Sequence, residues 1–167
     1  MNQPQEFEYP DWGKDYIHLV EGEVIEVLSK QATEFPVFLN TIINKADYSY
    51  APEKWTIKQV VGHLIDTERI FAYRLLCFSR GESAPLPGFE ENDYVENARF
   101  NDLNLPDLAE EFTLTRKSNL CLIKTLNEQE LNRLGTASGR RMSARAIVFA
   151  MAGHVIHHIN IINERYL

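Results

Sequence analysis

Histidines near the end of the chain are the residues whose type and spacing most clearly point to chemistry. His154 and His158 are four residues apart, so in a helix they lie on one face about one turn apart, as two ligands of one metal ion must. A projection at ~100° per residue places both on an apolar stripe with Ile147 and Met151, whereas His157 falls at the border of the polar arc. Burying polar groups without partners is costly. The pair is therefore a candidate metal site, and hydrogen-bonded core histidines are the alternative.

A third histidine strengthens the metal interpretation. His63 lies in a segment with helical periodicity, on a stripe with Thr67 and Arg74 that is unusually polar for an otherwise apolar helix. Helical bundles build metal and ligand sites in such polar-lined pockets. Three histidine ligands leave coordination positions open, which is typical of a catalytic rather than a structural site. The sequence thus predicts a divalent metal ion held by His63, His154 and His158.

One carboxylate has the spacing to support this site. Asp66 follows His63 by three residues, about one helical turn. It is a candidate general base, a further ligand, or a hydrogen-bond acceptor behind a ligand. The alternative role for Asp66 is an ion pair with Arg69 or Arg74.

Four long segments with helical periodicity must position these residues. They run roughly over 24–44, 56–78, 106–126 and from 143 almost to the end of the chain. Thr56 and Gln59 have the spacing of a capping box, and Ser143 is the expected N-cap of the last segment. Pro36 is expected to kink or briefly interrupt the first segment. Because no stretch shows convincing strand alternation, the predicted fold class is all-α, a four-helix bundle.

The connection from Gly81 to Leu105 is long for a bundle, and loops of this length are typically functional or disordered. It begins ~22 to 27 Å along the helix axis from His63, so it must fold back to reach the metal. We expect part of the segment 89–94 to pack near the metal pocket; a plain surface connection is the alternative. The carboxylates of this segment are candidate general bases: Glu90, Glu91 and Asp93.

Length and composition limit the remaining possibilities. A chain of 167 residues predicts one domain, here 1–167 with 1–15 as an N-terminal extension. The net charge of −7 argues against nucleic-acid binding. Residues 1–10 lack the features of a signal peptide, and no run approaches ~20 apolar residues, so neither secretion nor a membrane span is expected. Cys77 and Cys121 are interpreted as buried free thiols in a reducing cytoplasm.

Several stretches together resemble a known family. They are the segments YAPEKWTI at 50–57, HLIDTERIFAYR at 63–74, LPGF at 86–89, DYV at 93–95, GHVIHH at 153–158 and ERYL at 164–167. Each is weak alone, but the set is specific and covers nearly the whole chain from about Tyr16. On these motifs the chain resembles the DinB-like, or DinB/YfiT-like, superfamily of metalloenzymes.

The resemblance implies a four-helix bundle of up-down-down-up type with zinc or nickel on three histidines. The family's metal-binding positions fall on His63, His154 and His158. Some relatives resemble S-transferases that use low-molecular-weight thiols as cosubstrates, and others are described as metal-dependent hydrolases. Relatives that form dimers, together with amphipathic segments here, favour a homodimer.

Two classes of function follow. The leading hypothesis is a metal-dependent enzyme acting on a small molecule, in which the metal activates water in a hydrolase or a thiol in a transferase. The alternative is a non-catalytic helical bundle that binds a metal or a small ligand. Fold-level analogy does not choose the reaction.

Overall fold

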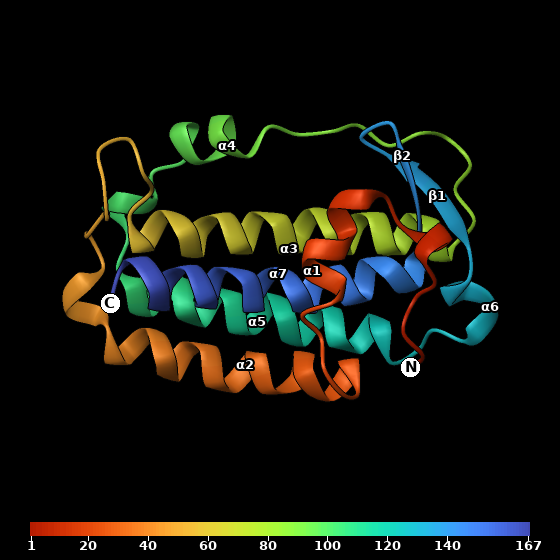
Figure 1. Ribbon diagram of the computed structural model, residues 1–167, viewed down its shortest axis with the longest axis horizontal. Helices are drawn as coiled ribbons and strands as arrows, with labels where there is room; N and C mark the ends of the chain where they lie inside the picture. The colour runs from red at the N-terminus through yellow and green to blue at the C-terminus, as the bar shows by residue number, and fades with distance from the viewer.

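Four long helices form the body of the computed structural model, which describes residues 1–167. They are α2 (Val24–Thr41), α3 (Ile57–Ser79), α5 (Leu105–Ile123) and α7 (Ala144–Arg165). The four lie side by side; in Figure 1, α2 and α7 run from right to left, whereas α3 and α5 run from left to right. The predicted all-α bundle is therefore confirmed in its main architecture.

Short elements join and cover these helices. They are the 3-10 turns η1 (Glu6–Glu8), η2 (Asp11–Gly13), η3 (Ile43–Lys45) and η4 (Phe100–Asp102), and the helices α1 (Lys14–Ile17), α4 (Glu91–Asn97) and α6 (Glu128–Leu131). The chain from α3 to α5 returns over α3 along the length of the bundle and carries α4 on the way (Figure 1). Because of this return, α5 can start at the same end of the bundle as α3.

The helix ends follow the expected capping rules. Thr56 and Gln59 form the predicted capping box at the start of α3, and Ser143 accepts a hydrogen bond from the Ala146 N–H at the start of α7. Gly81, just beyond α3, has φ +83°, which suits glycine. The prediction of a break at Pro36 was wrong, since α2 continues through this residue. Buried neighbours of the proline hold the helix together: Ala32, Phe35 and Leu39.

A small β-hairpin departs from the expectation of a purely helical chain. Strands β1 (Leu134–Ala137) and β2 (Arg140–Ser143) pair antiparallel. Ser138 and Gly139 form the turn with positive φ values of 52° and 68°, as a tight hairpin requires. Strands of four residues are too short to show a clear alternation of polar and apolar side chains. Leu86 bridges Ala137, so the hairpin also holds the start of the long connection.

Helix α7 lies at the centre of the core. Its residues from Ala144 to Val155 are all buried, and it contributes to both hydrophobic clusters, of 22 and 16 residues. A window within Ala144–Tyr166 is long and apolar enough to cross a membrane by length and composition, with a mean hydropathy of 1.3. Because 67% of that window is buried by the other elements, its apolar character is explained by the bundle core.

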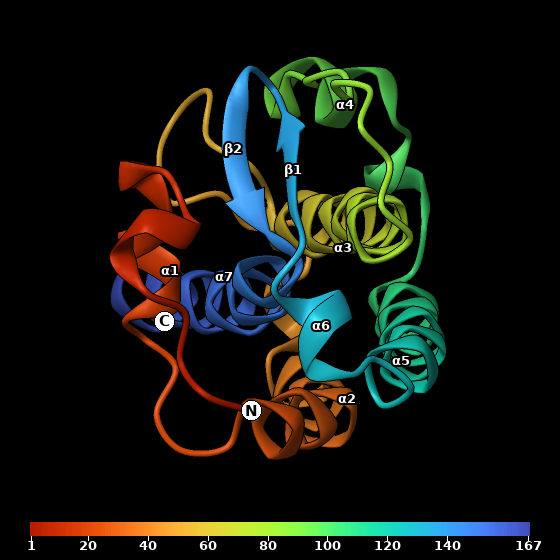
Figure 2. The ribbon, with the colours of Figure 1, turned by 90° about the vertical axis from the view of Figure 1, so that its right-hand side faces the viewer.

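The N-terminal residues pack onto the bundle rather than trailing from it. Tyr9 and Ile17 are buried in the larger core cluster, and α1 lies beside α7 in Figures 1 and 2. Gly153 permits this contact, because a Cβ atom there would overlap the backbone carbonyl of Tyr16. Residues 1–15, expected as an extension, are thus part of the packed structure.

A buried polar network joins all four long helices. The Arg116 guanidinium in α5 donates to the Glu68 carboxylate in α3 at 2.7 and 2.8 Å and to the Gln31 side chain in α2 at 2.6 Å. It also donates to the Met151 carbonyl in α7, and Asn119 donates to Glu68 at 3.0 Å. Arg116 is fully buried, so these bonds compensate the loss of its hydration.

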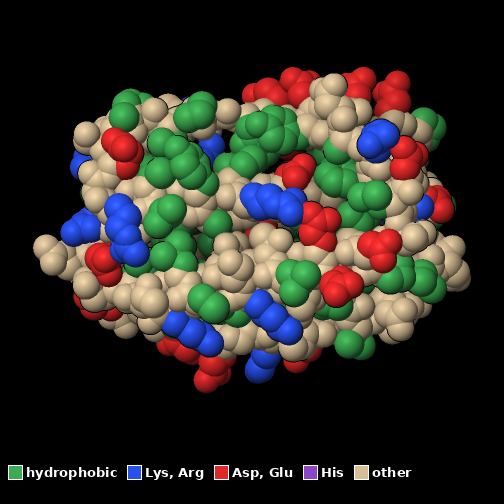
Figure 3. Space-filling model, turned by 180° about the vertical axis from the view of Figure 1, so that it is seen from behind, with side chains coloured by type: hydrophobic (Ala, Val, Ile, Leu, Met, Phe, Trp, Pro, Cys, Tyr) green, Lys and Arg blue, Asp and Glu red, His purple; other side chains and the backbone are tan.

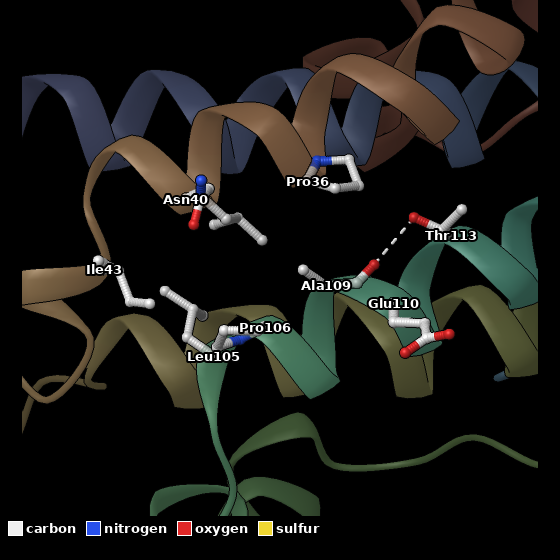
Figure 4. A pocket seen from close by; sticks show the side chains of 9 residues that line it. Pro36, Asn40, Ile43, Leu105, Pro106, Ala109, Glu110 and Thr113 are labelled. Carbon is white, nitrogen blue, oxygen red and sulfur yellow. Dashed lines mark hydrogen bonds between the residues drawn. The ribbon is translucent and has the colours of Figure 1, made fainter.

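A groove on the outside of the bundle lies between α2 and α5, which pack against each other (Figure 4). Its volume is about 360 Å³. It is lined by Pro36, Leu39, Asn40, Ile43, Leu105, Pro106, Ala109, Glu110 and Thr113. None of these residues comes from α3 or α7, so the groove is distinct from the histidines.

Candidate metal centre

Three buried histidines converge on one point inside the bundle. The Nε2 atom of His154 lies 3.1 Å from Nε2 of His63 and 3.1 Å from Nε2 of His158. One ring nitrogen from each of the three lies within 4.8 Å of the other two. The histidines that were predicted from spacing are therefore brought together, two from α7 and one from α3.

Contacts with neighbouring side chains fix two of these rings, those of His63 and His154. The capping box at Thr56 sets the start of α3, and His63 follows two turns later with its ring 4.9 Å from that of Trp55. Thr67, one turn further, places its hydroxyl 3.5 Å from His63 Nδ1. The phenol ring of Tyr16 packs edge-on against the His154 ring at 5.4 Å. These contacts orient the Nε2 atoms toward one another.

Burial keeps the three imidazoles neutral. Desolvation lowers the pKa of His63 from 6.5 to about 4, with Glu91 opposing the shift, and lowers the pKa of His158 to about 3. The pKa of His154 falls well below its ordinary value, first through burial and then through the neighbouring histidines. Neutral imidazoles are the form that binds metal ions, so the lone pairs at this site are available near pH 7.

The donor set fits a single divalent ion. Imidazole nitrogens bind zinc at ~2.0–2.1 Å, which places neighbouring donors about 3.3 Å apart in a tetrahedral arrangement. The observed separations of 3.1 Å are close to that value. A hydrogen bond can satisfy only one pair of such nitrogens at a time. A cation at the point of convergence would satisfy all three Nε2 lone pairs.

A cavity of about 250 Å³ opens beside His158. Its walls are Tyr50, Glu53, Lys54, Trp55, Val60, Asn92, His158, Ile161 and Tyr166. The ring of Tyr166 packs edge-on against Tyr50 at 4.9 Å, and its hydroxyl donates to the Trp55 carbonyl at 2.7 Å. The site is therefore reached through an opening with aromatic walls.

The long connection reaches this cavity, in line with the expectation that part of the segment 89–94 packs near the metal pocket. Asn92 of α4 lines the same cavity as His158. Glu91, its neighbour, is close enough to oppose the lowering of the His63 pKa and to contribute to the raised pKa of Tyr16, after burial and Asp15. Seen from behind, acidic side chains gather along the edge of the molecule over α4 (Figure 3). Of the three carboxylates predicted in this segment, Glu91 is the one whose charge affects the pKa of a clustered histidine, His63.

Asp66 does not join the histidines as a further ligand, and its role as a general base stays a prediction. It is absent from the histidine cluster, and it makes no hydrogen bond to any histidine. Its carboxylate lies 3.7 Å from Arg69, the alternative recognised in the sequence. Three residues at ~100° rotate Asp66 about 60° away from His63, whereas Thr67 lies about 40° to the other side. Thr67 therefore takes the place behind His63 that spacing alone assigned to Asp66.

The other candidates from the sequence lie outside the cluster. His157 is half-buried and contacts Tyr16, with ring centroids 5.3 Å apart, in line with its predicted place at the border of the polar arc. The prediction of two buried thiols was wrong for Cys121, which is exposed, while Cys77 is partly exposed. Position 121 falls on the outer face of α5, one residue beyond the buried Leu120.

Sequence reasoning missed the residues that shape the surroundings of the histidines. Tyr16 lies far from His154 along the chain, and no spacing rule connects the two positions, whereas Tyr166 follows His158 by only eight residues, about two helical turns, and was within reach of the helical projection. The signal that pointed to Tyr16 was Gly153, a glycine inside a helix immediately before His154. A glycine at such a place indicates close approach of another backbone.

Comparison with known proteins identifies the family and the fold. The family model of the DinB superfamily matches residues 36–162. The uncharacterized protein YjoA of Bacillus subtilis (strain 168) is 27% identical over 121 residues, which cover 70% of each protein. The fold is similar to that of YfiT from Bacillus subtilis, with a TM-score of 0.69 and 20% identity, covering 98% of this chain and 90% of that one. YfiT is described as a probable metal-dependent hydrolase with an unusual four-helix bundle topology. Because its family model spans most of the sequence, this chain belongs to the DinB superfamily.

Proposed function

We propose that this protein is a metal-dependent enzyme, a hydrolase of small molecules, with its divalent ion on His63, His154 and His158. One observation carries the proposal: three buried imidazoles converge on one point, and a cavity opens beside one of them, His158. Three protein ligands that leave a coordination position open to water or substrate are typical of catalytic metal sites. The description of YfiT as a probable metal-dependent hydrolase supports the same class.

The metal and the residues around it would have separate roles in the reaction. A bound divalent ion would supply Lewis acidity and lower the pKa of a coordinated nucleophile. The aromatic walls at Tyr50, Trp55 and Tyr166 restrict water and accept the apolar part of a substrate. The Asn92 side chain lines the cavity and can orient a polar substrate group. Glu91, whose charge reaches His63, is our candidate for accepting a proton in the reaction.

Zinc or nickel is the proposed ion, since imidazole ligands suit both metals. A thiol transferase with a low-molecular-weight thiol as cosubstrate would use the same three histidines, with the thiol as the activated nucleophile. A non-catalytic module that binds a metal or a small ligand would need the histidines but not Glu91. These two alternatives are outcomes of the experiment below.

The test combines metal analysis with activity. Protein purified without an affinity tag is loaded with zinc or nickel and assayed on panels of esters, amides and thiol adducts, with and without a small thiol. Metal-dependent turnover without thiol, reduced in Glu91→Gln while metal content is retained, is expected. Turnover only with thiol would replace the hydrolase by the transferase. Full metal occupancy with no turnover on any panel would favour the binding module.

Three further properties complete the proposal. The up-down-down-up order of the family is supported by the parallel directions of α3 and α5 in Figure 1.

A homodimer is supported by exposed apolar side chains on α2 and α5, Val37 at 66% and Leu114 at 60% exposure. Light scattering that gives a monomer mass over a wide concentration range would exclude it. The free thiols are compatible with a cytoplasmic location.

A further inference from the structure

Three arginines of this chain are buried, and one of them lacks a carboxylate partner. Arg116 pairs with Glu68 at 2.7 Å, and Arg145 pairs with Glu128 at 2.6 Å. Arg74 is only 5% exposed, yet it forms no salt bridge. A buried charge without a counter-charge is costly, and an arginine cannot escape that cost by losing its proton. Arg74 therefore differs from the other two.

The neighbours of Arg74 are neutral. Its Nη2 atom donates to the Pro87 carbonyl at 3.0 Å and to the Ser138 hydroxyl at 2.9 Å. Its guanidinium carbon lies 5.8 Å from the centre of the Phe89 ring. Burial lowers the pKa of Arg74, and no carboxylate opposes that shift. Both hydrogen bonds use one nitrogen, so Nη1 and Nε remain free to donate. Neither is among the buried atoms that lack a partner, so both still reach open space.

That open space is a cavity between α3 and the long connection. Its volume is about 270 Å³, and its walls are Arg69, Ile70, Tyr73, Arg74, Leu86, Pro87, Gly88, Phe89 and Tyr94. Arg69 stands at the rim, but its charge is already neutralised by Glu111 at 2.5 Å. The cavity thus combines apolar and aromatic walls with a single uncompensated cation at Arg74.

This cavity is separate from the histidine site. Arg74 follows His63 by eleven residues on α3, which is ~16 Å along the helix axis. The cavity at Arg74 and the cavity beside His158 have no lining residue in common. A ligand in the Arg74 cavity therefore need not touch the metal.

We propose that the Arg74 cavity is a second binding site, which takes a small carboxylate with an apolar or aromatic body. The carboxylate would accept hydrogen bonds from the free guanidinium nitrogens and supply the missing counter-charge. The body would pack between Ile70, Phe89 and Tyr94, in a space large enough for one substituted ring. The two bonds from Nη2 hold the guanidinium in place for this contact.

Calorimetry with benzoate as the probe tests the site, and benzamide serves as its neutral counterpart of the same shape. The full chain is titrated at pH 7.5 both with its metal and after chelation, since benzoate could also bind a metal ion. Benzoate is expected to bind in both states, and benzamide at least tenfold more weakly. Arg74→Gln should weaken the affinity for benzoate at least tenfold. Arg69 is already paired with Glu111, so Arg69→Gln should change the affinity by less than about threefold.

Two further variants keep the test decisive if Arg74→Gln does not fold. Ser138→Ala removes a bond that holds Arg74 but keeps the cation, so benzoate binding should persist. Ile70→Trp fills the cavity without changing charge, so benzoate binding should be lost. Equal binding of benzoate and benzamide, unchanged affinity in Ile70→Trp, or binding that disappears on chelation would each overturn the second site.

Discussion

The Nε2 atom of His154 lies 3.1 Å from the Nε2 atom of His63, 91 residues away in the chain. The contact joins α3 to the central helix α7 at the point where α4 covers the bundle. An ion held by both residues would close a long loop of chain, and such links restrict the unfolded state most when the loop is long. Metal binding and stability of the bundle should therefore be coupled.

The first prediction concerns the ligands of that ion. His63→Ala and His158→Ala should each remove the metal, because two imidazoles do not complete the set of three. His157→Ala should retain it, because the ring of His157 is outside the cluster. Elemental analysis of the purified variants gives the metal content per chain, and thermal unfolding with and without chelator gives the coupled loss of stability.

His18→Ala is the control, since His18 is an exposed histidine beside Tyr9. Full metal content in His63→Ala or His158→Ala would contradict the assignment. Loss of metal in His157→Ala but not in His154→Ala would mean that α7 is rotated relative to the arrangement described above.

A second prediction concerns pH. In the metal-free protein, burial lowers the pKa of His63 from 6.5 to about 4 and that of His158 to about 3. Below pH 6.5 the unfolded chain therefore binds protons that the folded chain does not. The free energy of unfolding should fall as pH decreases from 6.5 toward 4. Above pH 6.5, the contribution of these histidines to the free energy of unfolding should be constant.

Urea titrations of chelated protein at pH 7.5 and pH 5 measure this effect. The His63→Asn variant lacks one of the buried imidazoles and should show a smaller difference between the two pH values. A wild-type midpoint that is the same at both would show that the histidines are not held neutral by burial. Zinc should oppose the loss of stability, because it binds the same neutral imidazoles.

Much of this site could be predicted from the sequence, for identifiable reasons. His154 and His158 are one helical turn apart on an apolar stripe, and that relation is local. Thr56 and Ser143 cap their helices by local hydrogen bonds, so the helix starts were also predictable. The length of the long connection permitted its return toward the metal, and Asn92 indeed lines the cavity beside His158.

Other features depend on contacts that no local rule encodes. The edge-on packing of Tyr16 against the His154 ring joins two segments that are far apart in the chain. The pairing of Arg116 with Glu68 joins residues 48 apart on different helices. The hairpin at 134–143 was too short for a period-2 pattern, although Gly139 marked its turn. Such arrangements are set by tertiary packing rather than by propensity.

The buried ion pair leads to a third prediction. Arg116→Met should destabilise the protein by about 3–5 kcal/mol, because Glu68 would remain buried without a counter-charge. The double variant Glu68→Leu/Arg116→Met should recover much of that loss, since no isolated charge remains. Urea unfolding measures both. Arg80→Met, which removes an exposed partner of Glu130, should cost less than about 1 kcal/mol. A small effect in the single variant would mean that water reaches Glu68.

The last prediction compares two glycines that lie in helices. Within a helix, alanine is intrinsically favoured over glycine by about 1 kcal/mol, so any loss must come from tertiary contacts. At Gly153 an added Cβ would overlap the backbone of Tyr16, which cannot move without α1. At Gly62 it would meet only the side chain of Phe100, which is partly exposed and can rotate. We therefore expect Gly153→Ala to lower stability by about 1–3 kcal/mol and Gly62→Ala to have a smaller effect.

Hydrogen exchange distinguishes the two substitutions by location as well as by size. In Gly153→Ala, the amides of α1 should lose protection first, and metal affinity should fall because Tyr16 no longer packs against the His154 ring. In Gly62→Ala, any loss should be confined to the region around η4 and Phe100. If Gly153→Ala kept wild-type protection in α1 and wild-type metal affinity, the N-terminal segment would be a passive cover. If it lost both together, packing of α1 onto α7 would be part of what holds the His154 imidazole in place.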